Sequence, residues 1–191
     1  MDEIILRSMA KWPDVPAVYG WLALDRRGEW RIKSGSGGFE RIANAAMREF
    51  IGRNYAADAA GRWYFQNGPQ RVYISLEYTP WIYRLEGTGD ALVAHTGAVP
   101  REVDAAFLDD AGALLLHSEL GVGAVLDRDL PAFVERFGDF AAILDRVSLG
   151  EPMKLMLQGN SVPLAAIRAA EVPARFAFVP RPRPRPGEPD C

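Results

Sequence analysis

Two histidines and one carboxylate are the residues of this sequence that could bind a metal ion. They are His95, His117 and Glu119, and on a strand the last two would point to the same face. Two imidazoles and one carboxylate with open positions form a known metal constellation. The sequence therefore allows a metal-dependent hydrolase built on these residues, although nothing in it brings His95 to His117. The alternative is that both histidines are partly exposed residues at strand ends.

Other kinds of catalysis have no matching pattern. The single cysteine is Cys191, and no Gly-x-Ser-x-Gly elbow would present a serine nucleophile. The adjacent pair Asp109 and Asp110 is typical of a turn rather than of an acid–base pair. The glycine-rich loop 34–38 lacks the Lys and Ser or Thr that end a phosphate-binding loop. We therefore predict no catalytic residue and no cofactor.

A dense set of aromatic and arginine side chains is the richest candidate binding surface. By strand alternation Arg71, Tyr73 and Ser75 share one face. A sheet face with Tyr, Trp and Arg can bind a flat small molecule or a protein partner. The alternative is that the aromatic rings cover the second face of the sheet beneath a helix. The favoured function is a non-enzymatic binding or regulatory module. Its candidate ligand-binding residues are Arg71, Tyr73, Tyr78, Trp81 and Tyr83.

Three β-rich runs carry this surface, and turn residues separate them. We predict strands at 62–66, 71–77 and 81–86 that form an antiparallel meander. Asn67-Gly68-Pro69 and Thr79-Pro80 provide the turns between them. Further hairpin strands are predicted at 18–24, 29–33, 153–157 and 162–164.

Two main helices complete an α+β fold class. Residues 42–55 place apolar side chains at helical spacing, and Asn44 as an N-cap would give a shorter helix. The second helix follows Asp129 as its cap and has Pro131 in its first turn, where a missing N–H does no harm. Gly138 could divide this helix in two.

The phrase Asp-x-x-Gly before an apolar strand occurs three times, at Asp25, Asp58 and Asp109. The last two copies align residues 58–76 with residues 109–127. We therefore consider two similar tandem halves, 18–104 and 105–179, within one α+β domain that spans 1–179. The alternative is a coincidence of common turn residues. Residues 180–191 alternate proline with charged residues, and we predict a disordered tail there.

Composition limits the partners and the compartment. The net charge of −3 argues against nucleic acid, because duplex binding depends on Lys and Arg contacts with phosphates. No apolar run approaches the roughly 20 residues of a membrane span. The run Ile4-Ile5-Leu6 is too short for the core of a signal peptide. We predict a cytoplasmic protein whose partner is a small molecule or a protein, not nucleic acid or a membrane.

One stretch resembles a motif of an uncharacterised bacterial family, a domain of unknown function. It is Gly-Arg-Trp-Tyr-Phe-Gln-Asn-Gly-Pro-Gln-Arg-Val-Tyr, from Gly61 to Tyr73. Residues 18–28 and 76–81 add to the resemblance, which covers most of the chain except the tail. It implies a bacterial source and a mixed α+β fold. More distantly, the order of elements is similar to another uncharacterised bacterial family suspected of ligand sensing. Neither family brings an established reaction or catalytic residues.

Overall fold

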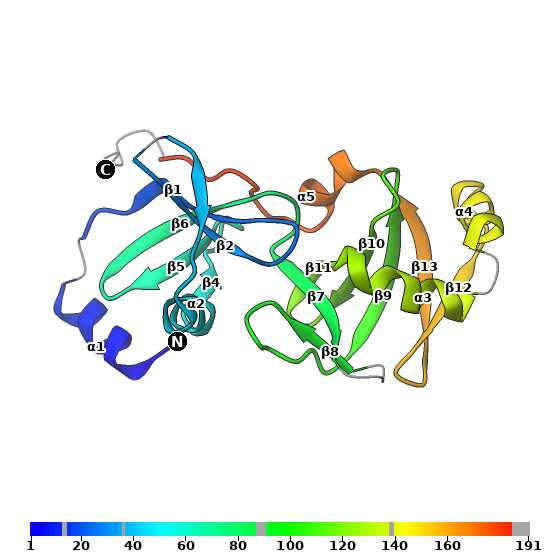
Figure 1. Cartoon of the computed structure of the whole chain (residues 1–191), viewed down its shortest axis with the longest axis horizontal. Coiled ribbons are helices and arrows are strands. Elements are labelled where there is room, and N and C mark those ends of the chain that lie inside the picture. The colour runs from blue at the N-terminus through cyan, green and yellow to red at the C-terminus, as the bar shows by residue number, and fades with distance from the viewer. Residues whose placement is uncertain (13–14, 36, 87–90, 138–139, 185–191) are drawn as a thin grey trace. The chain divides into compact units, whose positions relative to one another are not determined.

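The computed structural model describes the chain except residues 13–14, 36, 87–90, 138–139 and 185–191 (Figure 1). The chain divides into two compact units. Unit 1 comprises Met1–Tyr78 and Ala177–Cys191, and unit 2 comprises Thr79–Phe176. The division thus falls after Tyr78, whereas the sequence suggested halves at 18–104 and 105–179 within one domain. Each unit has its own sheet, and both sheets mix parallel and antiparallel pairs.

Unit 1 has a six-stranded sheet in the order β3-β2-β1-β6-β5-β4. All neighbours are antiparallel except β1 and β6, which are parallel. The strands are β1 (Val18–Leu24), β2 (Trp30–Lys33), β3 (Phe39–Arg41), β4 (Tyr55–Ala57), β5 (Trp63–Asn67) and β6 (Gln70–Leu76). The helices are α1 (Glu3–Lys11) and α2 (Ala45–Arg53). The Asn44 side chain accepts from the Met47 N–H, so the shorter of the two predicted helices is confirmed.

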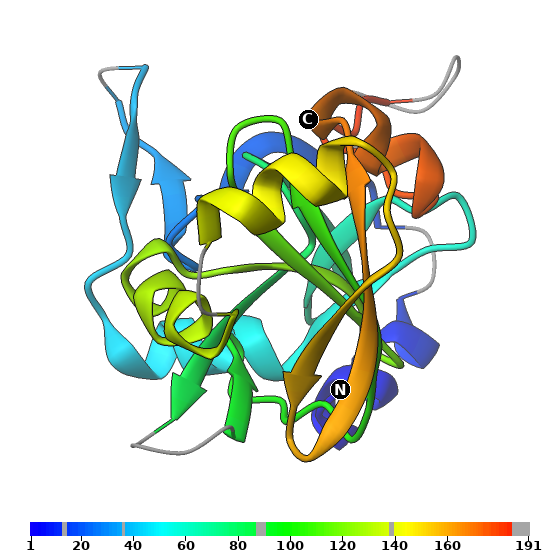
Figure 2. The same ribbon diagram turned by 90° about the vertical axis from the view of Figure 1, so that its right-hand side faces the viewer.

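Unit 2 has a seven-stranded sheet in the order β12-β13-β9-β10-β11-β7-β8. Two pairs, β7 with β11 and β13 with β9, are parallel. The strands are β7 (Trp81–Glu86), β8 (Ala91–Ala94), β9 (Val103–Asp109), β10 (Leu114–Ser118), β11 (Gly121–Val125), β12 (Met153–Leu157) and β13 (Asn160–Ile167). The helical segments are η1 (Asp127–Asp129), α3 (Leu130–Phe137), α4 (Phe140–Ser148), η2 (Ala169–Glu171) and α5 (Val172–Arg175). Both α3 and α4 contact β12, and α4 also contacts β13 (Figure 2).

The α+β class is confirmed, but the predicted three-stranded meander is wrong. Strands β5 and β6 form the expected antiparallel hairpin. Strand β7 leaves this sheet and pairs instead with β8 and β11 in unit 2. The second edge of β6 is occupied by β1, with Leu22 beside Ile74. A strand with two filled edges has no place for a third partner.

Five strands of each unit follow the same plan. The order β2-β1-β6-β5-β4 corresponds to β8-β7-β11-β10-β9, and each pair of neighbours has the same relative direction in both units. Strands β5 and β6 align with β10 and β11 in the register suggested by residues 58–76 and 109–127. This shared plan is consistent with two similar tandem halves.

The first residues of the predicted tail belong to unit 1. The Pro180 carbonyl accepts the Leu76 N–H at 2.7 Å, and Pro182 is buried. Residues 185–191, where a disordered tail was predicted, lie outside the described residues. None of the helices in the described part of the chain has the length and hydropathy that a membrane crossing would require.

Candidate functional site

In the three Asp-x-x-Gly turns the aspartate side chain accepts the same pair of backbone N–H groups. In each turn one carboxylate oxygen of the aspartate accepts the N–H groups two and four residues later, at 2.7–3.0 Å. The glycines have φ angles of 72° to 82°, which favour glycine. They are Gly28, Gly61 and Gly112. Differences between the three turns must therefore come from the side chains around them.

The Asp25 turn borders a cavity in unit 1, which we call the Asp25 pocket. Its volume is about 360 Å³. It lies at the carboxyl ends of the parallel strands β1 and β6, where open sheets commonly bind ligands. The lining residues are Ala23, Leu24, Asp25, Arg31, Phe39, Ser75, Leu76, Glu77 and Arg181.

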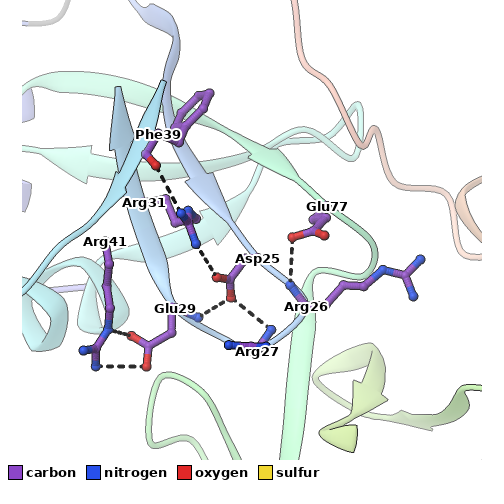
Figure 3. Close-up of polar contacts among 8 residues, drawn as sticks. All are labelled: Asp25, Arg26, Arg27, Glu29, Arg31, Phe39, Arg41 and Glu77. Atoms are coloured by element: carbon purple, nitrogen blue, oxygen red, sulfur yellow. Dashed lines mark hydrogen bonds and ion pairs between the residues drawn. The ribbon is translucent and has the colours of Figure 1, made fainter. Parts of the chain in front are cut away.

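Arg31 is fixed at the wall of the Asp25 pocket. Its Nη1 donates to Asp25 Oδ2 and its Nη2 donates to the Phe39 carbonyl, both at 3.1 Å (Figure 3). The Arg31 side chain is 39% exposed, whereas that of Asp25 is 10% exposed. A guanidinium has five N–H donors, so Arg31 can hold its position and still bind an anion.

The pocket lining also contains charged and aromatic side chains besides Asp25 and Arg31. They are Glu77, Arg181 and Phe39. Glu77 Oε2 accepts the Arg26 N–H at 3.2 Å (Figure 3), and both Glu77 and Arg181 are exposed. Phe39 keeps 37% of its surface exposed beside Arg31. The lining thus combines two carboxylates, two guanidinium groups and one accessible aromatic ring.

At the Asp58 turn a buried arginine pairs with the aspartate. Arg62 Nε donates to Asp58 Oδ2 at 2.7 Å, and both side chains are 10% exposed. The Arg62 Nη groups donate to the hydroxyls of Tyr19 (3.2 Å) and Tyr73 (2.9 Å). Burial acts to raise the pKa of Asp58, but hydrogen bonds from Arg62, Tyr73 and Ala60 outweigh it and lower this pKa. The network is a well-satisfied buried ion pair.

The five predicted ligand-binding residues lie in two different units. Arg71, Tyr73 and Tyr78 belong to unit 1, whereas Trp81 and Tyr83 lie on β7 in unit 2. Arg71 stacks on the Tyr64 ring, Tyr73 on Tyr19, and Tyr78 carries the Arg26 guanidinium. The four aromatic residues are at most 8% exposed, which leaves little ring surface for a ligand.

Trp81 and Tyr83 make hydrogen bonds inside unit 2. Trp81 Nε1 donates to the Leu120 carbonyl at 2.7 Å. The Tyr83 hydroxyl lies 2.8 Å from Ser118 Oγ and donates to the Gly121 carbonyl at 3.1 Å. Burial raises the pKa of Tyr83 to about 12.

The three candidate metal ligands have other neighbours. His117 Nδ1 lies 2.7 Å from Asp104 Oδ1, and Glu119 accepts the N–H of Arg101, which lowers the pKa of Glu119. His95 Nδ1 accepts the Ile82 N–H at 3.3 Å, and burial lowers the pKa of His95 to about 3. Among the described residues no group of three or more His, Cys, Asp or Glu side chains could hold a metal ion.

None of the nine lining residues is among the five predicted ligand-binding residues, and the missed residues include Arg31, Phe39, Glu77 and Arg181. One local signal was available, because the Asp25 turn directly follows a strand. The predicted face of Arg71, Tyr73 and Ser75 does reach the pocket through Ser75. Ser75 lies beside Ala23 in the parallel pair of β6 and β1.

The two mixed sheets and the helices define an α+β class of protein. The Asp25 pocket in unit 1 does not by itself identify a reaction. The chain belongs to the family DUF2944, described as "Protein of unknown function (DUF2946)", whose model matches residues 1–183. Membership of an uncharacterised family is thereby confirmed. No curated protein matches the sequence. The chain is similar to the crystal structure of a DUF1285 family protein from Silicibacter pomeroyi, with a TM-score of 0.51 and 15% identity. The match covers 81% of this chain and 85% of that chain, and it shows the fold alone.

Proposed function

We propose that the protein is a non-enzymatic, cytoplasmic bacterial module that binds a small molecule in the Asp25 pocket and acts as a regulator. The observation that carries this proposal is the position of Arg31. Two hydrogen bonds hold its guanidinium at the wall of a cavity, yet its side chain stays 39% exposed. The cavity of about 360 Å³ lies within the range of small-molecule sites, roughly 300–1,000 Å³.

The lining suggests which ligand the pocket accepts. A carboxylate would pair with Arg31, and Arg181 adds a second positive charge nearby. A flat apolar body would pack on the accessible ring of Phe39. The ligand is therefore a small aromatic carboxylate rather than nucleic acid or a membrane surface.

The first measurement is native mass spectrometry of the protein purified without chelators. A retained small molecule supports the proposal, and its mass identifies the ligand. A second experiment uses a defined probe, phenylacetate, against its neutral analogue phenylacetamide in ligand-observed NMR titrations. We expect phenylacetate to bind, and the Arg31→Met variant to lose about tenfold or more in affinity.

Arg41→Gln is the matched control. Arg41 is an exposed arginine on β3 that forms an ion pair with Glu29 outside the pocket lining (Figure 3). It should leave phenylacetate binding unchanged. Equal affinities of phenylacetate for the wild type and for Arg31→Met would refute the proposed site. If the native mass equals that of the protein alone and neither probe binds, a protein partner is favoured instead.

A further inference from the structure

A second cavity, in unit 2, also borders an Asp-x-x-Gly turn and a parallel pair of strands, but these strands do not correspond to β1 and β6 in the shared plan. This Asp109 pocket has a volume of about 490 Å³. It lies at the carboxyl ends of the parallel strands β9 and β13, where Asp109 is the register partner of Ile167. As in unit 1, an Asp-x-x-Gly turn directly follows one of the two parallel strands. In both units an Asp-x-x-Gly turn and a parallel pair of strands thus border a cavity.

The inner wall of the Asp109 pocket is apolar. It includes Leu108, Val147 and Ile167, which are at most 8% exposed, and the half-buried Leu144 of α4. Such a wall cannot replace the water around a bare inorganic cation. It favours a ligand with a hydrocarbon body.

The rim of the pocket carries an excess of carboxylates. The exposed carboxylates of Asp110 and Glu171 accompany one guanidinium, that of Arg168, whereas the third carboxylate of the lining, Asp109, is buried. Asp110 Oδ1 accepts the Ala169 N–H at 2.8 Å, which fixes an exposed carboxylate at the rim. The Arg168–Glu171 pair is 3.7 Å apart, with side chains 78% and 59% exposed. An exposed pair of this kind stabilises little and can open for a ligand.

We propose that the Asp109 pocket binds an amphipathic organic cation, namely an ammonium group attached to an apolar body. The ammonium group lies at the rim with Asp110 and Glu171, and the apolar body lies against Leu108, Leu144 and Val147. The Asp25 pocket has no such excess of carboxylates, because Arg31 and Arg181 match its two carboxylates in number. This inference for unit 2 does not depend on the ligand proposed for unit 1.

Three probes that share one aromatic body test the proposal on the full chain. They are phenethylamine, 2-phenylethanol and 3-phenylpropionate, titrated by ligand-observed NMR at low salt. We expect the amine to bind about tenfold or more tightly than the alcohol, because a charge-assisted hydrogen bond is roughly twice as strong as a neutral one. At the Asp109 pocket the anion should bind least, whereas the Asp25 pocket of the same chain is expected to bind it, so the ranking is read from shift changes at the Asp109 pocket alone. Chemical shift changes in the protein should map to β9, β13 and α4.

The double variant Asp110→Asn with Glu171→Gln should remove the preference for the amine over the alcohol. Glu135→Gln is the matched control, because Glu135 is an exposed carboxylate of α3 outside the pocket lining. An unchanged backbone NMR spectrum would show that each variant is folded. Equal binding of amine and alcohol to the wild type would overturn the proposal, as would amine binding that the double variant leaves intact. Failure of all three probes to bind would overturn it as well.

Discussion

Units 1 and 2 build the same five-strand plan from different side chains, and the Asp58 and Asp109 turns show the difference most clearly. In both turns the aspartate carboxylate accepts the backbone N–H groups two and four residues later. The residue after the glycine is Arg62 in unit 1, where it forms a buried ion pair with Asp58. The aligned residue in unit 2 is Ala113, and a cavity borders the Asp109 turn. The same turn can therefore form a buried ion pair with an arginine, as in unit 1, or border a cavity, as in unit 2.

The largest expected effect follows from removing this arginine. Arg62→Met leaves Asp58 buried without its cation, and loss of one partner of a buried pair costs about 3–5 kcal/mol of unfolding free energy. The loss should be measured by urea denaturation and located in unit 1 by hydrogen exchange. Arg31→Met is the matched comparison. Because the Arg31 side chain is more exposed, this substitution should lower the free energy of unfolding by about 1 kcal/mol or less. Equal losses would mean that burial does not distinguish the two turns.

The glycines of the two turns should also differ. A Cβ added at Gly61 would lie 2.0 Å from the Ala177 carbonyl oxygen, whereas one at Gly112 meets no atom within 4 Å. Gly112→Ala therefore adds only the strain of a positive φ, about 1–2 kcal/mol. Gly61→Ala adds a steric conflict as well, for a total of about 2–4 kcal/mol. Thermal unfolding of both variants measures the difference, and a milder effect at Gly61 would contradict the contact with Ala177.

Acid should destabilise unit 2 through His95. Its folded-state pKa of about 3 lies below the ordinary value of 6.5, so the unfolded state binds the proton more readily. The stability is therefore complete above pH 6.5 and falls progressively as the pH decreases toward 3. At pH 5 the expected loss is about 2 kcal/mol.

Both histidines of the chain lie in unit 2, so hydrogen exchange should show this loss there and not in unit 1. His95→Asn is the control, because an amide oxygen can accept the Ile82 N–H without titrating near neutral pH. A pH slope between 6.5 and 5 that survives in this variant would assign the effect to another group.

The smallest effect is expected for an exposed ion pair near the Asp25 pocket. Arg41 donates twice to Glu29, at 2.8 and 3.0 Å (Figure 3), and its side chain is 56% exposed. Solvent screens such a pair, so Arg41→Gln should leave the urea midpoint unchanged within the scatter of the measurement. A loss comparable to that of Arg62→Met would show that bidentate geometry matters more here than burial.

Local features of the fold could be predicted from the sequence. The hairpins of β1 with β2 and of β12 with β13 follow from side-chain alternation and turn residues, and the start of α2 follows from Asn44. The parallel pairs could not be predicted, because their partners are far apart in sequence. Leu22 and Ile74 are one example, and no local pattern identifies them as neighbours.

The candidate site was harder to predict for the same reason. Strand alternation predicts Ser75 on the face with Arg71 and Tyr73, and of these three residues only Ser75 is among the pocket lining. The other chemical groups come from separate segments, including Arg31 on β2 and Arg181 near the end of the chain. Only the parallel pairing of β1 with β6 and the return of the C-terminal segment bring them together. The aromatic residues that the sequence offered as a binding surface are instead at most 8% exposed.

The return of residues 177–184 to unit 1 sets the order in which the protein can mature during synthesis. The Val179 N–H donates to the Gly61 carbonyl, and the Leu76 N–H donates to the Pro180 carbonyl. Val179 and Pro180 leave the ribosome after unit 2, which is one uninterrupted stretch of chain. Unit 2 can therefore complete its contacts first, although unit 1 emerges earlier. The Asp25 pocket, which includes Arg181, therefore forms only after unit 2 has been synthesised. A ligand of this pocket binds only chains in which the segment after unit 2 has returned to unit 1.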